Sequence, residues 1–298
     1  MDYSKYLSDK DSEHIKKYKC QQYAKISERH KNDVLLPKNA HLRCISIGCV
    51  GNLAFAIHHL YYFKGECEKI YMDFTKKSLT DWENKENPYD KIFNQVLTKE
   101  FVPIPCAGLA LFDYDETVLD DIRKSTQHFF SFNQNLIDVV DKIVLNKNIG
   151  NKTLGVHIRM NDWNAWHGGQ LGIIRYDDYV KEIDMVLKNN DINNIFIASD
   201  NVETLEKLKQ RYGIKLVWAD DVSREKNEEE IGDENSLRIK AMNRLTGEFN
   251  FITPFIDLLS LMKCEYLIAR KYSNFSSTAI FLGNMKFKNI FILPKTNI

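Results

Sequence analysis

The stretch TLGVHIRM, residues 153–160, opens the half of the chain that decides the fold. It is a short apolar run bounded by polar residues, which is typical of a buried strand. Four similar runs follow it: NIFIASD at 194–200, KLVWAD at 215–220, YLIAR at 266–270 and NIFILP at 289–294. Helical patterns lie between or beside these runs, at 176–190, 202–212, 236–245, 254–263 and 276–283. This alternation predicts a doubly wound parallel sheet.

The first half begins with a strand, a turn, a helix and another strand. HLRCISIG at 41–48 indicates a buried strand, CVGN a glycine turn, 53–63 an apolar helix and KIYMDF at 69–74 a second strand. Residues 80–115 show little periodicity, and we expect irregular structure with short helices there. Residues 116–145 have apolar positions at helical spacing, which predicts one long helix or a helix pair.

A polar, glycine-bearing segment, LNKNIGNK at 145–152, separates the two halves. We therefore predict two domains, residues 1–147 and 148–298. The fold class is α/β, with two Rossmann-like domains whose mainly parallel sheets face a cleft.

Composition excludes some partners. The 41 basic residues balance 41 acidic ones, so we expect no binding to nucleic acid or to an anionic membrane surface. Eighteen apolar residues never run together, so no transmembrane segment is expected. The chain is predicted to be cytoplasmic, or a soluble part of an anchored enzyme.

Ligands of open α/β sheets bind beyond the carboxyl ends of the strands, and three features of the chain fall at such positions. The first is GCVGN at 48–52, where Gly51 and Asn52 precede a helix. Glycines let the backbone approach a phosphate or a sugar closely. A tight strand-to-helix turn without a ligand explains the pattern equally well.

The second feature is the end of the opening stretch. Because side chains alternate along a strand, His157 and Arg159 share one face. An arginine there suits phosphate oxygens, although a structural salt bridge is an open alternative. Asp162, Trp163, Trp166 and His167 follow in the predicted loop. Aromatic residues beside a carboxylate are typical of surfaces that stack on sugar rings, but they also occur as hydrophobic lids.

The third feature is SNFSSTA at 273–279, after the strand YLIAR. Its hydroxyls and amides at a helix start could bind phosphate, while plain N-capping by Ser273 or Ser276 would need no ligand. Upstream, Asp257 lies in an apolar helix, where a carboxylate either bonds internally or accepts from a base edge such as that of guanine. Asp200 ends another strand, as a ligand group or as a helix cap.

Taken in order, these motifs resemble the fucosyltransferase superfamily with the GT-B fold. They are G-x-x-G-N, H-I-R-x-x-D, S-D, a later Asp, and S-x-F-S-x-x-A. The similarity is greatest to the α-1,2-fucosyltransferase group, which resembles glycosyltransferase family 11, and extends to the α-1,6- and protein O-fucosyltransferases. The chain departs from that pattern at Leu53, where the group has Gln, and at Met160 and Asn161, where Arg and Gly are usual.

The resemblance implies an inverting, metal-independent enzyme that moves L-fucose from GDP-β-L-fucose to a glycan hydroxyl, with α-1,2 linkage. Its partners would be the nucleotide sugar and the glycan acceptor, and no cofactor or metal is expected. The implied catalytic residues are Arg159, Asp162 and His167, with the last two as candidate bases. The implied donor-binding residues are His157, Arg159, Asp200, Asp257, Ser273, Phe275, Ser276 and Ser277. The implied acceptor-binding residues are Gly51, Asn52, Trp163 and Trp166.

Two other functions fit the same patterns. A GT-B transferase that uses another nucleotide sugar would share the sheet and the arginine. A noncatalytic carbohydrate-binding module would need Trp163 and Trp166 but not Arg159.

Overall fold

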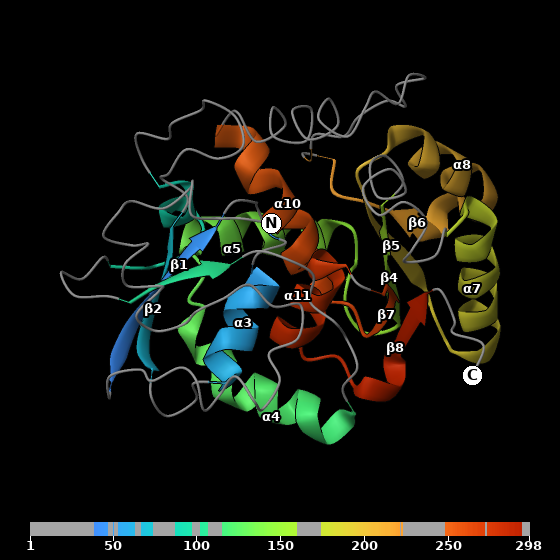
Figure 1. Cartoon of the computed structure of the whole chain (residues 1–298). Helices are drawn as coiled ribbons and strands as arrows, with labels where there is room; N and C mark the ends of the chain where they lie inside the picture. Colours follow the sequence, from blue (N-terminus) through green and yellow to red (C-terminus); the bar gives the residue numbers. More distant parts are fainter. Residues whose placement is uncertain are drawn as a thin grey trace, which may run out of the picture.

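Two parallel β-sheets form the framework of the protein in a computed structural model (Figure 1). The structure describes residues 39–46, 50, 53–62, 67–73, 87–96, 102–106, 115–159, 174–220, 222, 248–271 and 273–293. The first sheet has the order β2-β1-β3 and consists of β1 (Ala40–Ser46), β2 (Cys67–Asp73) and β3 (Val102–Cys106). Helix α3 (Leu53–Tyr62) connects β1 to β2, as the strand–helix–strand pattern predicted.

The second sheet confirms the predicted parallel, doubly wound arrangement. Its order is β6-β5-β4-β7-β8. Its strands are β4 (Thr153–Ile158), β5 (Asn194–Ser199), β6 (Leu216–Val217), β7 (Tyr266–Arg270) and β8 (Ile290–Leu293). Its helices are α7 (Tyr176–Asn189), α8 (Val202–Tyr212), α10 (Glu248–Met262) and α11 (Asn274–Leu282). The helix predicted at 236–245 lies outside the described residues.

Strand β3 was missed in the segment 80–115, which was expected to be irregular. Its sequence is VPIPC, and proline cannot donate a hydrogen bond to a neighbouring strand. Among the described strands, β3 has β1 as its single partner and so lies at an edge of the sheet, where prolines at alternate positions are tolerated. The short 3₁₀ helix η3 (Pro88–Lys91) in the same segment matches the expected short helices.

Residues 116–145 form a helix pair. Helix α4 (Glu116–Thr126) continues into the 3₁₀ turn η4 (Gln127–Phe129), and α5 (Gln134–Asn146) starts after the cap residue Asn133. The side chain of Asn133 accepts a hydrogen bond from the N–H of Asn135, which satisfies one of the amides at the helix start. This cap is the local signal that separates the two helices.

Helix α10 begins six residues earlier than predicted. The prediction began the helix at Pro254, the first residue of the run PFIDLLSLMK. The helix instead starts at Glu248 and contains Pro254. Phe251 and Phe255 are buried on this helix and both contact the ring of Tyr89 edge-on. Burial of two aromatic rings outweighs the hydrogen bond that proline removes.

Helices α10 and α11 lie between the two sheets (Figure 1). Helix α11 packs on α3, and α10 packs on α5. One hydrophobic cluster therefore runs from residues such as Leu53 and Ile57 to Phe255 and Phe281. A second cluster fills the space between the larger sheet and helices α7 and α8. The predicted boundary between residues 147 and 148 stays a prediction, since the first cluster draws residues from both sides of it.

Helix α4 holds the carboxyl end of α11. The buried guanidinium of Arg123 donates to the carbonyl of Ile280 through Nε (3.1 Å) and one terminal nitrogen (2.8 Å). The amide of Gln127 donates to the carbonyl of Leu282 (3.1 Å). The last carbonyls of a helix accept no hydrogen bond inside the helix, so these two side chains satisfy them. The guanidinium of Arg123 also adds a favourable positive charge at this end of the helix.

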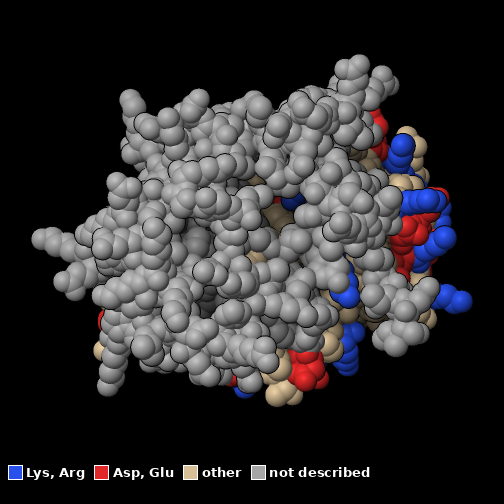
Figure 2. All heavy atoms as spheres, viewed as in Figure 1, with Lys and Arg blue, Asp and Glu red and all other residues tan. Residues whose placement is uncertain are grey.

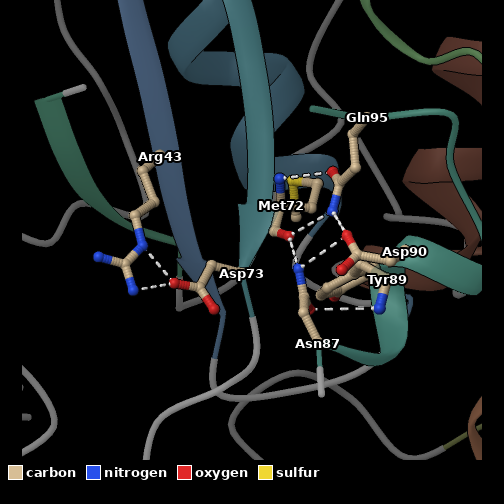
Figure 3. Close-up of polar contacts among 7 residues, drawn as sticks. All are labelled: Arg43, Met72, Asp73, Asn87, Tyr89, Asp90 and Gln95. Carbon is tan, nitrogen blue, oxygen red and sulfur yellow. Dashed lines mark hydrogen bonds and ion pairs between the residues drawn. The ribbon is translucent and has the colours of Figure 1, made fainter. Parts of the chain in front are cut away.

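The edge strand β2 is protected by side chains of the segment that follows it (Figure 3). The amide of Gln95 both accepts from the N–H of Met72 (2.9 Å) and donates to its carbonyl (2.9 Å). Asn87 donates to the same carbonyl (2.6 Å). An exposed strand edge can pair with another chain, and this amide occupies the groups that would do so.

Charges on the surface are mixed in sign. Figure 2 shows basic and acidic side chains next to one another on the side of the molecule formed by α7 and α8, where Arg211 pairs with Asp184 (2.6 Å). Within the described part of the chain, the helices are too short or too polar to cross a membrane.

Candidate functional site

The candidate site lies where the chain changes direction across the larger sheet. Strand β4 is followed in sequence by β5 on one side, while β7 pairs on its other side. The connections that leave such a pair of strands diverge, which makes the carboxyl ends of β4 and β7 a favoured ligand position. Arg159 directly follows β4, Arg270 ends β7, and Asp200 directly follows β5.

His157 connects β4 to the start of α11. It is buried in a strand whose residues are all buried, and its ring stacks on Phe275 with 4.6 Å between ring centroids. Its Nδ1 lies 2.7 Å from the hydroxyl oxygen of Ser276 and 3.5 Å from that of Ser273. The Ser276 oxygen also accepts from the main-chain N–H of Arg270 (3.1 Å). The Ser276 hydroxyl therefore hydrogen-bonds both to the imidazole of His157 and to the main chain of Arg270.

The imidazole of His157 is neutral at ordinary pH. Burial, and to a smaller extent the neighbouring charges of Arg159 and Arg270, lower the pKa of His157 to about 3. Desolvation penalises the charged form, and two nearby cations repel a third positive charge. His157 therefore adds no charge to the site.

The two arginines are joined through the main chain. A terminal nitrogen of Arg270 donates to the carbonyl oxygen of Arg159 at 2.9 Å. Burial lowers the pKa of the Arg270 guanidinium, Arg159 lowers it further, and Tyr179 and Asp200 act in the opposite direction. Tyr179, from α7, is fully buried, which raises its pKa to about 12. The arrangement places two guanidinium groups near one strand end.

Helix α11 adds its positive end to these cations. Ser273 is its N-cap, with the hydroxyl accepting from the N–H of Ser276 (3.4 Å) and the carbonyl accepting from the N–H of Ser277 (2.9 Å). The amino end of a helix carries a partial positive charge and binds anions such as phosphate. Two arginines, a neutral histidine and a helix start together suit an anionic ligand.

The structure brings together part of the predicted donor set. His157, Ser273, Phe275 and Ser276 are in mutual contact, and Arg159 and Asp200 lie close enough to influence Arg270. Ser273 acts as the N-cap of α11, which was the alternative to phosphate binding. The hydroxyl of Ser276 was expected to face a phosphate, but it is occupied by Arg270 and His157, because the end of β7 turns its N–H toward α11 rather than toward β4.

Two other predicted donor residues lie on the neighbouring helices. Ser277 is buried on α11, one position after Ser276. Asp257 is buried on α10 with Thr253 and Ser260, at helical spacing along one side. Helix α10 packs on α11 and lies beside β4 and β5, so Asp257 is carried by a helix adjacent to the cluster.

Six predicted site residues lie outside the described residues. They are the candidate bases Asp162 and His167 and the acceptor-binding residues Gly51, Asn52, Trp163 and Trp166. Their roles stay predictions.

Two residues of the cluster, Arg270 and Tyr179, were not predicted. Arg270 ends the run YLIAR at the carboxyl end of a strand, the same position that singled out Arg159, so the signal was present in the sequence. Tyr179 lies in an amphipathic helix in which a tyrosine on the apolar side is indistinguishable from ordinary core packing. Only the strand order places both beside Arg159.

Among the described residues, no three His, Cys, Asp or Glu side chains are grouped so that they could hold a metal ion. Asp113 and Asp115 have the D-x-D spacing often associated with metal binding by glycosyltransferases. Asp115 is the N-cap of α4, and its carboxylate accepts from the N–H of Val118 (2.9 Å). Asp113 lies outside the described residues.

Comparisons with known proteins find similarity at the level of solved structures. No protein-family model matches the chain, and no curated protein matches its sequence. The fucosyltransferase NodZ from Bradyrhizobium matches with 11% identity and a TM-score of 0.43, over 84% of this chain and 94% of NodZ. NodZ α-1,6-fucosyltransferase co-crystallised with GDP matches with 10% identity and a TM-score of 0.44, over 84% of this chain and 93% of that one. POFUT1 in complex with GDP matches with 12% identity and a TM-score of 0.39, over 87% of this chain and 74% of POFUT1. At such values the function of the chain has to be inferred from its own residues.

Proposed function

We propose that the chain is a fucosyltransferase that moves L-fucose from GDP-β-L-fucose to a hydroxyl of a glycan. The observation that carries the proposal is the position of Arg159 at the carboxyl end of β4, beside Arg270 and the start of α11. This cluster offers positive charge where a nucleotide diphosphate binds in α/β sheets. The choice of GDP-β-L-fucose as the donor rests on the order of the motifs in the sequence.

Arg159 would stabilise the departing diphosphate. Cleavage of the bond at fucose C1 leaves positive charge on the sugar ring and negative charge on GDP. A preorganised donor at that position is typically worth about 3 kcal/mol in the transition state. We propose that this cation takes the place of a metal ion, and that the reaction inverts the anomeric configuration to give an α-linkage, of the α-1,2 type.

The acceptor hydroxyl must lose a proton, and His157 is not suited to receive it. Its Nδ1 is occupied by Ser276, and a pKa of about 3 makes the imidazole a weak base near neutral pH. We propose Asp162 or His167 as the base instead. Trp163 and Trp166 would stack on the acceptor sugar, with Gly51 and Asn52 contributing from the other half of the chain.

We propose that Asp257 binds the guanine base of the donor. A carboxylate accepts two hydrogen bonds from the edge of guanine but matches uracil or cytosine poorly. Burial of Asp257 on α10 would favour this discrimination, because a hydrogen bond to a charged group is stronger away from water. The proposal therefore includes selectivity for GDP over UDP and CMP.

The test is a titration of the protein with GDP, UDP and CMP by calorimetry, followed by turnover assays with GDP-fucose, GDP-mannose and UDP-sugars. We expect GDP to bind and GDP-fucose to be consumed in the presence of EDTA. Arg159→Met should weaken GDP binding about 100-fold, which corresponds to about 3 kcal/mol. Arg211→Met removes an exposed arginine of α8 and is the matched control, with unchanged affinity expected.

Each other outcome points elsewhere. Tight binding of UDP or turnover of GDP-mannose would identify a transferase with another donor. Binding of a glycan without any nucleotide would favour the carbohydrate-binding module. Full GDP affinity in Arg159→Met would refute the diphosphate assignment, and loss of turnover with EDTA would refute metal independence.

A further inference from the structure

We infer that Arg270 is a positioning residue that fixes the main chain of Arg159 across a gap between β4 and β7. The inference deepens the proposed function and rests on it, since Arg159 is the proposed diphosphate ligand. Arg270 lies 111 residues further along the chain and was not among the predicted site residues. Its guanidinium is buried, with 2% of the residue exposed, so it acts from within the fold and not from the surface.

The gap is visible in the strand register. Strands β4 and β7 pair from Leu154–Tyr266 to Val156–Ile268. Beyond that point each strand continues to pair with its other neighbour, β4 up to Ile158–Ser199 and β7 up to Arg270–Leu293. The carboxyl ends of β4 and β7 are therefore held from their outer sides, and the ladder between them stops before Arg159.

Arg270 bridges this gap with two hydrogen bonds. Its main-chain N–H donates to the Ser276 hydroxyl, which in turn bonds to His157 of β4. Its guanidinium donates to the carbonyl of Arg159. These two connections replace the main-chain ladder and fix the last residues of β4 on both sides of Ile158.

Tyr179 lies beside the guanidinium of Arg270. Its hydroxyl belongs to a fully buried residue of α7 and lies near both Arg270 and the main chain of Arg159. A buried arginine beside another arginine is unfavourable by itself. Asp200 offsets part of this positive charge, and an anionic ligand at Arg159 would add a second negative charge beside the two arginines.

Arg123 offers a matched control. It is also a buried arginine that donates to a main-chain carbonyl, that of Ile280, but at the opposite end of α11. Loss of the Arg123 guanidinium removes two hydrogen bonds to the carbonyl of Ile280, and loss of the Arg270 guanidinium removes the bond to the carbonyl of Arg159. A purely structural role for Arg270 therefore predicts that Arg270→Met and Arg123→Met behave alike.

The first experiment needs no ligand. Amide hydrogen exchange is followed in peptides that cover residues 153–159 in wild type, Arg270→Met and Arg123→Met. We expect faster exchange of this segment in Arg270→Met than in Arg123→Met at matched distance from each melting temperature. Equal exchange in the two variants would overturn the inference, even if GDP proved not to be the nucleotide.

The second experiment is a double-mutant cycle with GDP as the probe. Arg270→Met should weaken GDP binding about tenfold in wild type and have little further effect in the Arg159→Met background, because it acts through Arg159. Arg270→Lys should recover part of the loss, and Tyr179→Phe should cause a smaller one. Additive losses, or unchanged affinity in Arg270→Met, would refute the positioning role. If wild type binds no GDP, the proposed function fails while the exchange experiment still decides the inference.

Discussion

The two sheets of the protein each contain an arginine that is largely shielded from water, but the partners of the two arginines differ. In the smaller sheet Arg43 of β1 forms an ion pair with Asp73 at the end of β2, through Nε and a terminal nitrogen (Figure 3). In the larger sheet the guanidinium of Arg270 donates to the main-chain carbonyl of Arg159 and has both Arg159 and Asp200 as charged neighbours. The first arrangement is complete without a ligand. The second places positive charges together, which a protein does where an anion binds.

The comparison also separates the two interpretations of an arginine within a strand pattern. A structural salt bridge and an anion ligand were both open for Arg159, and Arg43 shows what the salt bridge looks like in this fold. The side chain of Asp73 is 2% exposed and that of Arg43 is 15% exposed, so the pair is shielded from water. Four predictions compare variants in the two sheets, beginning with the largest expected effect.

Arg43→Met should destabilise the protein by about 3–5 kcal/mol, because Asp73 is left as a buried charge without its cation. Denaturant unfolding measures the change. The double variant Arg43→Met with Asp73→Asn should be less destabilised than Arg43→Met, since no charge is left. A double variant as unstable as the single one would contradict the buried-charge account. GDP affinity should stay unchanged in both.

Ser276→Ala should cost about 2 kcal/mol of unfolding free energy, because it leaves the N–H of Arg270 and the Nδ1 of His157 without their common partner. Ser273→Ala removes an N-cap and should cost about 1 kcal/mol. Each variant loses one hydroxyl from the same helix start, so the two losses can be compared directly. A larger loss for Ser273→Ala would mean that capping, and not the link between β7 and β4, is the main role of these serines.

His157→Gln should remove part of the acid sensitivity of the fold. The pKa of His157 is about 3 in the folded chain and 6.5 for an ordinary histidine, so protonation favours the unfolded state. This stability is present above pH 6.5 and is lost as the pH falls toward 3, at up to about 1.4 kcal/mol per pH unit. Between pH 6.5 and pH 4.5, the free energy of unfolding should fall more steeply with decreasing pH for wild type than for His157→Gln. Parallel curves would show that the histidine is accessible to protons when folded.

Gln95→Ala should have the smallest effect, about 1 kcal/mol or less, since water can replace its bonds to Met72 at the half-buried edge of β2. Its clearer consequence is self-association, because the strand edge is uncovered. Sedimentation velocity at increasing concentration would detect it. A variant that stays as monodisperse as wild type would show that Asn87 covers the edge sufficiently.

Much of the fold could be predicted from local pattern. The five strands of the larger sheet were predicted, because buried parallel strands are short apolar runs between polar turns. Strand β3 was missed, since VPIPC reads as a loop and is accepted only at a sheet edge. Helix α10 was placed too late, since the burial of Phe251 against Tyr89 is not visible in its own sequence.

The sequence by itself predicted that His157 and Arg159 share one face at the end of a strand and that Ser273 or Ser276 caps a helix. These are consequences of the period of a strand and of capping chemistry, which act over a few residues. The tertiary structure decided that Arg270 reaches Arg159 and that the Ser276 hydroxyl bonds to His157 and to the main chain of Arg270. Those contacts depend on β7 lying beside β4, and strand order is set by the packing of the whole sheet, on which the periodicity of a single strand carries no information.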